Sequence, residues 1–188
     1  MEPSSISTQR LILRQWRAED LAPFAALNAD PEVMEFFPSR LDRAESDACA
    51  NRIQDHLQAH GWGLWAVEQK CDGRFVGFVG LNTLRPELPF SPGIEVGWRL
   101  AKEFWGLGYA TEAASQCLRF AFEELNQNEI LSFTSVLNER SIAVMKRIDL
   151  TNRDSDFDHP SIPEGHPVRR HVLYGIVRSE WQSHGERP

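Results

Sequence analysis

Hydrophobic residues along the chain gather into short runs separated by polar turns. Runs rich in branched and aromatic residues are typical of strands. They predict strands at residues 8–16, 65–68, 75–84, 94–100, 130–137 and 170–177. Apolar residues spaced three or four apart predict helices at residues 20–28, 43–60, 111–125 and 140–148.

The turns between these runs carry their own signals. Asp72-Gly73 between two apolar runs is typical of a hairpin. Three prolines place residues 84–93 in a loop. Strands and helices interleave without a repeat or a linker, so residues 1–188 are expected to form one domain. The predicted class is α/β (α+β) with a mostly antiparallel sheet, and the tail from Ser183 is expected to fray.

Amino-acid composition and charge limit the kinds of function that the protein can have. Apolar residues make up 41% and charged residues 25%, which is typical of a globular domain. The formal charge of −7, without a block of lysine or arginine, argues against a nucleic-acid partner. An acidic surface suits cationic acceptors such as amines, although solubility accounts for it equally well.

Cysteine usage and hydropathy narrow the classes further. Cys49, Cys71 and Cys117 are odd in number and have no C-x-x-C spacing, which argues against a disulfide framework or a zinc finger. The first residues do not resemble a secretory signal, and no apolar run approaches the ~20 residues of a membrane span. We therefore expect a cytoplasmic protein with no membrane partner.

The most informative stretch is residues 104–113, Phe-Trp-Gly-Leu-Gly-Tyr-Ala-Thr-Glu-Ala. It follows a predicted strand, contains two glycines and opens a predicted helix. Glycine lets the backbone approach a ligand, and the first turn of a helix offers unpaired N–H groups. The stretch therefore predicts an anion cradle, for which a pyrophosphate is the best-fitting ligand.

Two familiar pyrophosphate loops fit less well. The nucleoside-triphosphate loop needs G-x-x-x-x-G-K-[ST], and no such run is present. The dinucleotide fingerprint G-x-G-x-x-G would place its third glycine at Thr111, and the strand at 130–137 runs into Asn138 rather than into an acidic residue. A nicotinamide enzyme is thus an alternative that lacks its third glycine.

The stretch instead resembles the coenzyme A loop of the GNAT superfamily of N-acetyltransferases. The likeness is greatest to the branch that includes the ribosomal-protein N-terminal acetyltransferases, whose loop reads much like W-G-x-G-Y-A-T-E-A. Residues 8–14, 94–98 and 138–145 resemble other segments of that branch, in the family's order. The resemblance implies a six- to seven-stranded, mostly antiparallel sheet flanked by helices, with central strands splayed apart. Gly97 would lie in the strand beside the gap, where a glycine often marks a bulge or a close backbone approach.

The same resemblance implies an activity. The protein would move an acetyl group from acetyl-CoA to a primary amine of a protein N-terminus or a small molecule, by direct attack in a ternary complex and without a metal. It would act as a monomer or homodimer. The alternative is a coenzyme A-binding regulatory or interaction module with little turnover.

Ligand-binding residues follow from the resemblance, position by position. Backbone groups of Trp98, Arg99 and Leu100 would pair with pantetheine. Trp105 would be a further cofactor-binding residue, and the residues expected to hold the pyrophosphate are Gly106, Leu107, Gly108, Tyr109, Ala110 and Thr111. Asn138 would bond the pantetheine amide, or else only cap the helix that follows it.

Two side chains are the candidate catalytic residues. Glu95 lies on the strand expected to line the acetyl group, and burial would raise its pKa toward the range of a general base. A purely structural carboxylate paired with an arginine is the competing interpretation, in which case the base would be Glu68, Asp158, His159 or water. Ser141 could protonate the leaving thiolate, because the position where many superfamily members carry a tyrosine acid is Met145 here.

Two features of the sequence, the residue after the last predicted helix and a group of acidic and histidine residues, differ from known patterns. Asp149 stands where the family helix usually ends in glycine, so a left-handed residue with a local stability cost is expected there. Residues 154–159 resemble a calcium loop but lack its glycine and its glutamate. His159, His166 and His171 fit no standard zinc spacing, so no metal is expected.

Overall fold

The computed structural model describes residues 4–185 of the chain, and a mixed sheet forms the centre of this part. Its order is β1-β2-β3-β4-β5-β6-β9-β7, with β8 paired to β9. The strands are β1 (Ile6–Ser7), β2 (Leu11–Arg14), β3 (Leu64–Gln69), β4 (Phe75–Thr83), β5 (Ile94–Leu100), β6 (Glu129–Ser135), β7 (Thr151–Asn152), β8 (Phe157–Asp158) and β9 (Arg170–Val177).

The sheet confirms the expected class and corrects the strand count. All neighbouring strands in the described residues pair antiparallel except β5 and β6, which are parallel. The sheet has nine strands instead of six or seven. The difference comes from β1, β7 and β8, which have two residues each. A pair that short leaves no alternation in the sequence.

The helices are α1 (Leu21–Ala29), α2 (Arg43–His60), α3 (Tyr109–Glu123), α4 (Glu139–Arg147) and α5 (Arg178–Gly185), with 3-10 turns η1 (Ala18–Asp20) and η2 (Lys102–Phe104). A capping box between Asp42 and Glu45 starts α2, and Gly61 ends it with a left-handed φ of 76°. Asp149 after α4 has the expected left-handed conformation, with φ 63°. The tail predicted to fray from Ser183 is helical in its backbone to Gly185, and residues 186–188 lie outside the described part.

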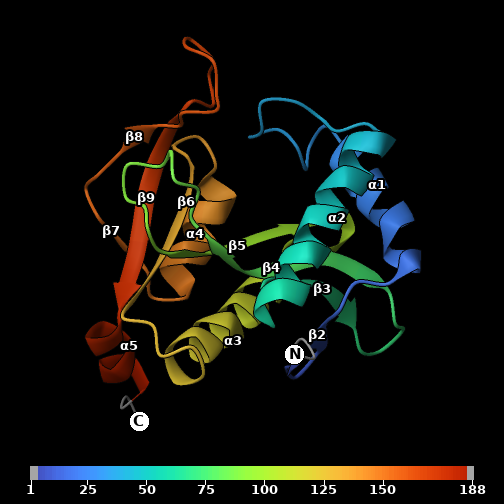
Figure 1. Ribbon diagram of the computed structural model, residues 1–188, viewed down its shortest axis with the longest axis horizontal. Coiled ribbons are helices and arrows are strands. Elements are labelled where there is room, and N and C mark those ends of the chain that lie inside the picture. Colours follow the sequence, from blue (N-terminus) through green and yellow to red (C-terminus); the bar gives the residue numbers. More distant parts are fainter. Residues whose placement is uncertain (1–3, 186–188) are drawn as a thin grey trace.

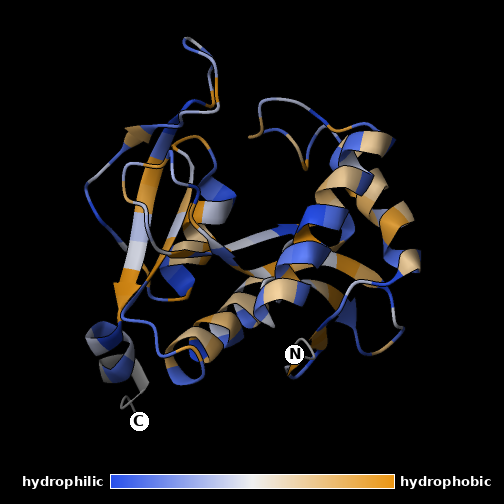
Figure 2. Ribbon diagram, viewed as in Figure 1, coloured by the Kyte–Doolittle hydropathy of each residue, from blue (hydrophilic) through white to orange (hydrophobic). Residues whose placement is uncertain are grey.

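Helices cover both faces of the sheet (Figure 1). Phe24 of α1 packs against Phe78 of β4, with ring centroids 6.0 Å apart. Trp65 of β3 packs against Phe120 of α3 at 5.5 Å. Trp65 is paired with Val79, the neighbour of Phe78, so α1 and α3 lie on opposite faces. Figure 2 shows hydrophobic residues concentrated along the strands between these layers. None of the helices within residues 4–185 combines the length and apolarity that a bilayer crossing requires.

The splayed strands that the resemblance implied are β5 and β6. Their pairing is limited to Glu95 opposite Leu131, beside a hydrogen bond of 2.9 Å from Ser132 Oγ to the carbonyl of Val96. Beyond this point the two strands diverge (Figure 1). β4 and β5, in contrast, stay in register from Ile94 to Leu100 without a bulge. A Cβ added to Gly97 would meet nothing within 4 Å, so this glycine faces open space.

Candidate active site

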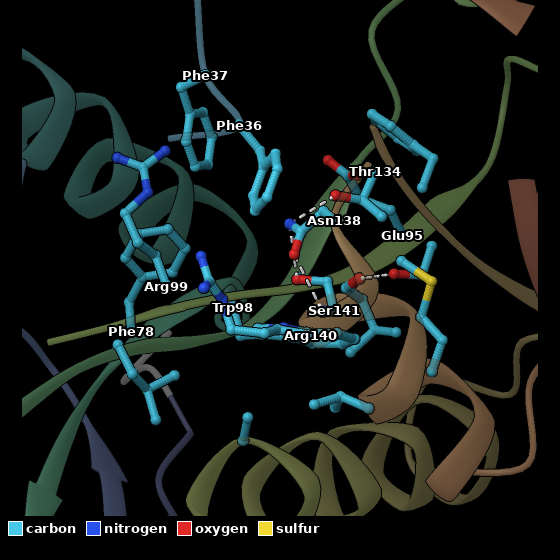
Figure 3. A pocket seen from close by; sticks show the side chains of 18 of the residues that line it. Phe36, Phe37, Phe78, Glu95, Trp98, Arg99, Thr134, Asn138, Arg140 and Ser141 are labelled. Atoms are coloured by element: carbon cyan, nitrogen blue, oxygen red, sulfur yellow. Dashed lines mark hydrogen bonds between the residues drawn. The ribbon is translucent and has the colours of Figure 1, made fainter. Parts of the chain in front are cut away.

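The gap between β5 and β6 opens into a cleft of about 1350 Å³. Its walls come from β5, the end of β6, and the first turns of α3 and α4. α2 and the loop between α1 and α2 close the side opposite α3. Figure 3 shows the side chains that project into the cleft from these elements. Every residue predicted to bind the ligand or act in catalysis lines it except Leu107.

The glycine turn has the geometry of an anion cradle. Gly106 and Gly108 have φ of 73° and 79°, which only glycine adopts without strain. A Cβ at Gly106 would meet nothing within 4 Å, so the space in front of the turn is open. Within the described residues, the backbone N–H groups from Gly106 to Thr111 have no protein acceptor. A row of free donors at the start of α3, where the helix dipole is positive, fits a pyrophosphate.

The β5 edge that faces the gap also carries free backbone groups. The carbonyl of Val96 points toward β6, and peptide groups of alternate residues point to the same edge of a strand. The backbone of Trp98 therefore faces the gap. The carbonyl of Leu100 faces it too, but accepts a hydrogen bond of 2.9 Å from Trp105 Nε1. The backbone of Arg99 faces β4, so only its side chain is directed into the cleft.

Glu95 is a half-buried carboxylate on the cleft-facing side of β5. Burial raises its pKa to about 7, against the opposing effects of a hydrogen bond from Asn82 and the charge of Arg85. The distance from Asn82 Nδ2 to Glu95 Oε1 is 3.1 Å. A carboxyl group with this pKa exchanges a proton near neutral pH, which suits a general base.

Asn138 and Ser141 form a small hydrogen-bonded group at the start of α4 (Figure 3). Asn138 Oδ1 accepts from the Ser141 backbone N–H at 3.1 Å, so Asn138 caps the helix. Its Nδ2 donates to Thr134 Oγ1 at 3.0 Å and to Ser141 Oγ at 3.1 Å. The capping interpretation therefore describes the contacts of Asn138 in this structure, and its ligand role stays a prediction.

Comparison with known proteins connects this geometry to a family. The family model of the acetyltransferase (GNAT) domain matches residues 10–151. The chain is 33% identical over 166 residues to FsC-acetyl coenzyme A-N(2)-transacetylase of Aspergillus fumigatus, covering 82% of this chain and 68% of that protein.

The chain belongs to the GNAT acetyltransferase family. It is therefore an acetyl-CoA-dependent acyltransferase. A GNAT acetyltransferase of Bacillus anthracis has the same fold, with a TM-score of 0.78, 22% identity and coverage of 94% of this chain and 100% of that one. A ribosomal-protein-S5-alanine acetyltransferase of Vibrio fischeri also shares the fold, with a TM-score of 0.73, 19% identity and coverage of 95% and 98%.

Leu107 lies apart from the other residues predicted to hold the pyrophosphate in this acetyltransferase. The side chain of Leu107 is 47% exposed and lies outside the cleft lining. The Leu107 carbonyl accepts a hydrogen bond of 2.9 Å from Arg10 Nη1, and Arg10 also pairs with Glu112 at 2.6 Å. Arg10 thus holds the glycine turn against α3. No sequence spacing indicates this contact, because Arg10 and Leu107 are 97 positions apart.

The structure of the acetyltransferase distinguishes among the alternative candidates for the general base. Glu68 and Asp158 do not line the cleft, since Glu68 pairs with Arg14 at 2.7 Å and Asp158 lies on β8. His159 lines it, but burial, aided by the nearby His171, lowers its pKa to about 4. His159 is therefore neutral in the range where Glu95 titrates. Met145 is 1% exposed and offers no proton, as the sequence indicated.

Metal ligands do not gather around this site. Within residues 4–185, no three His, Cys, Asp or Glu side chains come together in a group that could hold an ion. His159 and His171 do approach each other, with ring centroids 5.0 Å apart. They pack with Phe133 and Phe157 in an aromatic cluster at the β8–β9 end of the cleft.

Arg99 is a further cleft residue whose side chain the sequence analysis did not consider. Its Nη1 donates to Asn28 Oδ1 at 2.6 Å, and its guanidinium carbon lies 4.0 Å from the ring centroid of Phe37. Phe78 flanks it at 5.5 Å. Burial lowers the pKa of Arg99 to about 10. The group stays charged at neutral pH, and it lies on the same strand face as Glu95.

Proposed function

We propose that this acetyltransferase transfers an acetyl group from acetyl-CoA to a primary amine of a protein N-terminus or a small molecule, by direct attack in a ternary complex. Acetyl-CoA supplies the activated acetyl group when it is bound. The observation that carries the proposal is Glu95, a cleft carboxylate whose pKa is raised to about 7 by burial. It lies on the strand that borders the gap and can take the proton of an attacking amine.

The remaining residues serve binding and orientation. The N–H groups from Gly106 to Thr111 hold the pyrophosphate, as their open geometry supports. The backbone of Trp98 lies at the gap edge of β5, where its N–H can donate to a thioester oxygen. Asn138 positions pantetheine from the start of α4. Ser141 Oγ, one turn along that helix, delivers a proton to the departing thiolate directly or through water.

The kind of amine sets how much the base contributes. An α-amine with a pKa near ~8 costs roughly 1.4 kcal/mol to deprotonate at pH 7, whereas a lysine-like amine near ~10.4 costs about 4.6 kcal/mol. The name of the Aspergillus fumigatus relative places its acetyl group on an N(2) nitrogen. That similarity supports an amine acceptor without choosing between a protein N-terminus and a small molecule.

Ligand-dependent stability tests the donor half of the proposal. Coenzyme A at a hundredfold excess over its dissociation constant should stabilise the folded protein by about 2.7 kcal/mol. Gly108→Leu should abolish this shift. Gly73→Leu is a matched control, because Gly73 also has a left-handed φ, 72°, but lies in the hairpin turn between β3 and β4. A wild-type melting temperature that saturating acetyl-CoA leaves unchanged would refute the assignment of the cradle.

Thiol release tests the catalytic half. Wild-type protein mixed with acetyl-CoA and a panel of amines should release free coenzyme A only in the presence of an accepted amine. The buried Met145, at the position of the usual tyrosine acid, favours the alternative of a coenzyme A-binding regulatory module. That alternative predicts a normal thermal shift with no thiol release from any amine in the panel.

A further inference from the structure

The guanidinium of Arg99 is a fixed positive charge in the cleft, and it has no counter-ion in the part of the chain that the structure describes. Within the described residues it forms one hydrogen bond, to Asn28, and no ion pair. Its Nε atom is buried and has no acceptor. A guanidinium can donate five hydrogen bonds, so most of the capacity of Arg99 is unused. Leaving a buried charged donor unsatisfied costs free energy that a suitable anion recovers.

Uncharged side chains fix the position of the Arg99 guanidinium. Asn28 in α1 is fully buried, and its Nδ2 donates to Ser46 Oγ of α2 at 2.9 Å. This bond fixes the amide so that Oδ1 points at Arg99. Phe37 then covers one side of the guanidinium at 4.0 Å. The charge is therefore oriented by groups that do not neutralise it, which is the arrangement of a binding residue rather than of a structural ion pair.

Arg99 lies at a defined place relative to the proposed base. Glu95 and Arg99 share one face of β5, and four residues span about 13 Å along a strand. Figure 3 shows them at opposite ends of the row of cleft side chains, with Arg99 beside Phe37. Phe36 and Phe37 line the same cleft. An acceptor whose amine lies near Glu95 can thus extend an apolar chain toward Arg99.

We propose that Arg99 determines acceptor specificity by binding a carboxylate, so that the preferred acceptor carries an amine and a carboxylate separated by several bonds. This inference rests on the proposed acetyl transfer to an amine. A carboxylate is small and planar, and it pairs with the planar fork of a guanidinium through two parallel hydrogen bonds.

Two acceptors that differ only in the carboxylate measure its contribution to acceptor binding. 6-Aminohexanoate and 6-aminohexanamide have the same amine and chain length, and the remote substitution leaves the basicity of the amine nearly unchanged. The wild type should show a KM for the acid at least tenfold below that for the amide. Arg99→Gln should raise the KM for the acid about 10- to 100-fold, the worth of a charge-assisted hydrogen bond, and change that for the amide less than twofold. A shorter series, from glycine to 4-aminobutanoate, measures the preferred separation.

Control variants separate recognition from folding. Arg52→Gln removes another positive charge from the cleft lining, at an exposed position of α2, and should change both KM values less than threefold. Arg99→Gln can keep a hydrogen bond to Asn28. A purely structural role would instead lower kcat or stability with the acid and the amide alike. Equal KM values for acid and amide in the wild type would overturn the proposal.

A binding measurement decides the question without turnover. Hexanoate, which has no amine, should raise the melting temperature of the wild type in saturating coenzyme A, and hexanamide should not. Arg99→Gln should lose the hexanoate shift. If no amine is acetylated but this pattern holds, the proposed function fails while the carboxylate site stands. If hexanoate and hexanamide act alike on the wild type, the carboxylate site fails.

Discussion

Arg14, which is buried, and Arg99, which is half-buried, show how differently this protein treats charge at the edge of the sheet and in its central cleft. Arg14 of β2 forms two hydrogen bonds to Asp20, at 2.7 and 2.9 Å, and one to Glu68 at 2.7 Å. The hydrogen bonds that Arg14 donates to Asp20 are the main reason that the pKa of Arg14 is raised. Arg99 of β5 has no carboxylate partner among the described residues, and its pKa is lowered.

The carboxylates show the same contrast. Asp20 is 3% exposed and is neutralised by Arg14, whereas Glu95 has a neutral partner, Asn82, and a raised pKa. Paired charges at the edge of the sheet satisfy one another and leave nothing for a ligand. Separate charges in the cleft cost stability and are available for proton transfer and binding. The predictions below test this division.

Glu95→Gln should have the largest effect on turnover. It should lower kcat by roughly 10²–10⁴, because glutamine keeps the size of the side chain but cannot take a proton. The acid limb of the pH–rate profile, set by the pKa of about 7, should disappear, and acetyl-CoA binding should survive. Steady-state kinetics across pH 5–9 measures both. Glu139→Gln, at an exposed position of the cleft lining, is the control. If Glu95→Gln keeps wild-type turnover and an unchanged pH–rate profile, the base is His159 or water instead.

Asp20→Asn should have the largest effect on folding. Removing the charge that neutralises Arg14 should lower the free energy of unfolding by about 2–4 kcal/mol, with Glu68 still in contact with the arginine. Turnover per folded molecule should not change. Urea unfolding is the measurement, and Asp47→Asn, in an exposed pair with Arg43, should cost less than about 0.5 kcal/mol. A loss of kcat in folded Asp20→Asn would contradict the proposed division.

Stability against pH should separate Glu95 from the paired carboxylates. A Glu pKa raised from 4.5 to about 7 gives stability that is present below pH 4.5 and is lost as pH rises through 7. Glu95→Gln should therefore match the wild type at low pH and exceed it by about 1–3 kcal/mol at pH 8. His159, whose pKa is lowered, destabilises both proteins equally as pH falls toward 4, so it cancels in the comparison. Parallel curves for the two proteins would show that Glu95 is not desolvated.

Ser141→Ala should have the smallest effect. We expect turnover to fall about two- to tenfold with little change in coenzyme A affinity, because a thiolate leaves readily even without a strong acid. The Asn138 cap keeps its bond to the backbone N–H of residue 141, so the fold should persist. Steady-state kinetics with both substrates varied is the measurement. Unchanged kcat would assign the proton to solvent.

Local features of the fold and the site were predictable from the sequence, whereas contacts between distant residues were not. The bounds of α2 and β9 agree with the predicted 43–60 and 170–177, because caps, a terminal glycine and branched residues mark them in the sequence. The left-handed glycines of the turn were predictable for the same reason. The hydrogen bond between Arg99 and Asn28 joins residues that are 71 positions apart, and no sequence spacing predicts it. The ion pair of Glu68 with Arg14, on a different strand, and its place outside the cleft lining were equally unpredictable from spacing.

The glycine turn has a consequence for how such enzymes diversify. Because its donors are peptide groups, mutation can rewrite its side chains freely as long as the left-handed glycines persist. The opposite wall is made of side chains from α2 and from the loop between α1 and α2, and these can change without disturbing the cradle. The same acetyl-donor side of the cleft can therefore be combined with acceptor sides that bind unrelated amines. A sequence relative of this chain is named an N(2)-transacetylase, and a protein of the same fold is named a ribosomal-protein-S5-alanine acetyltransferase.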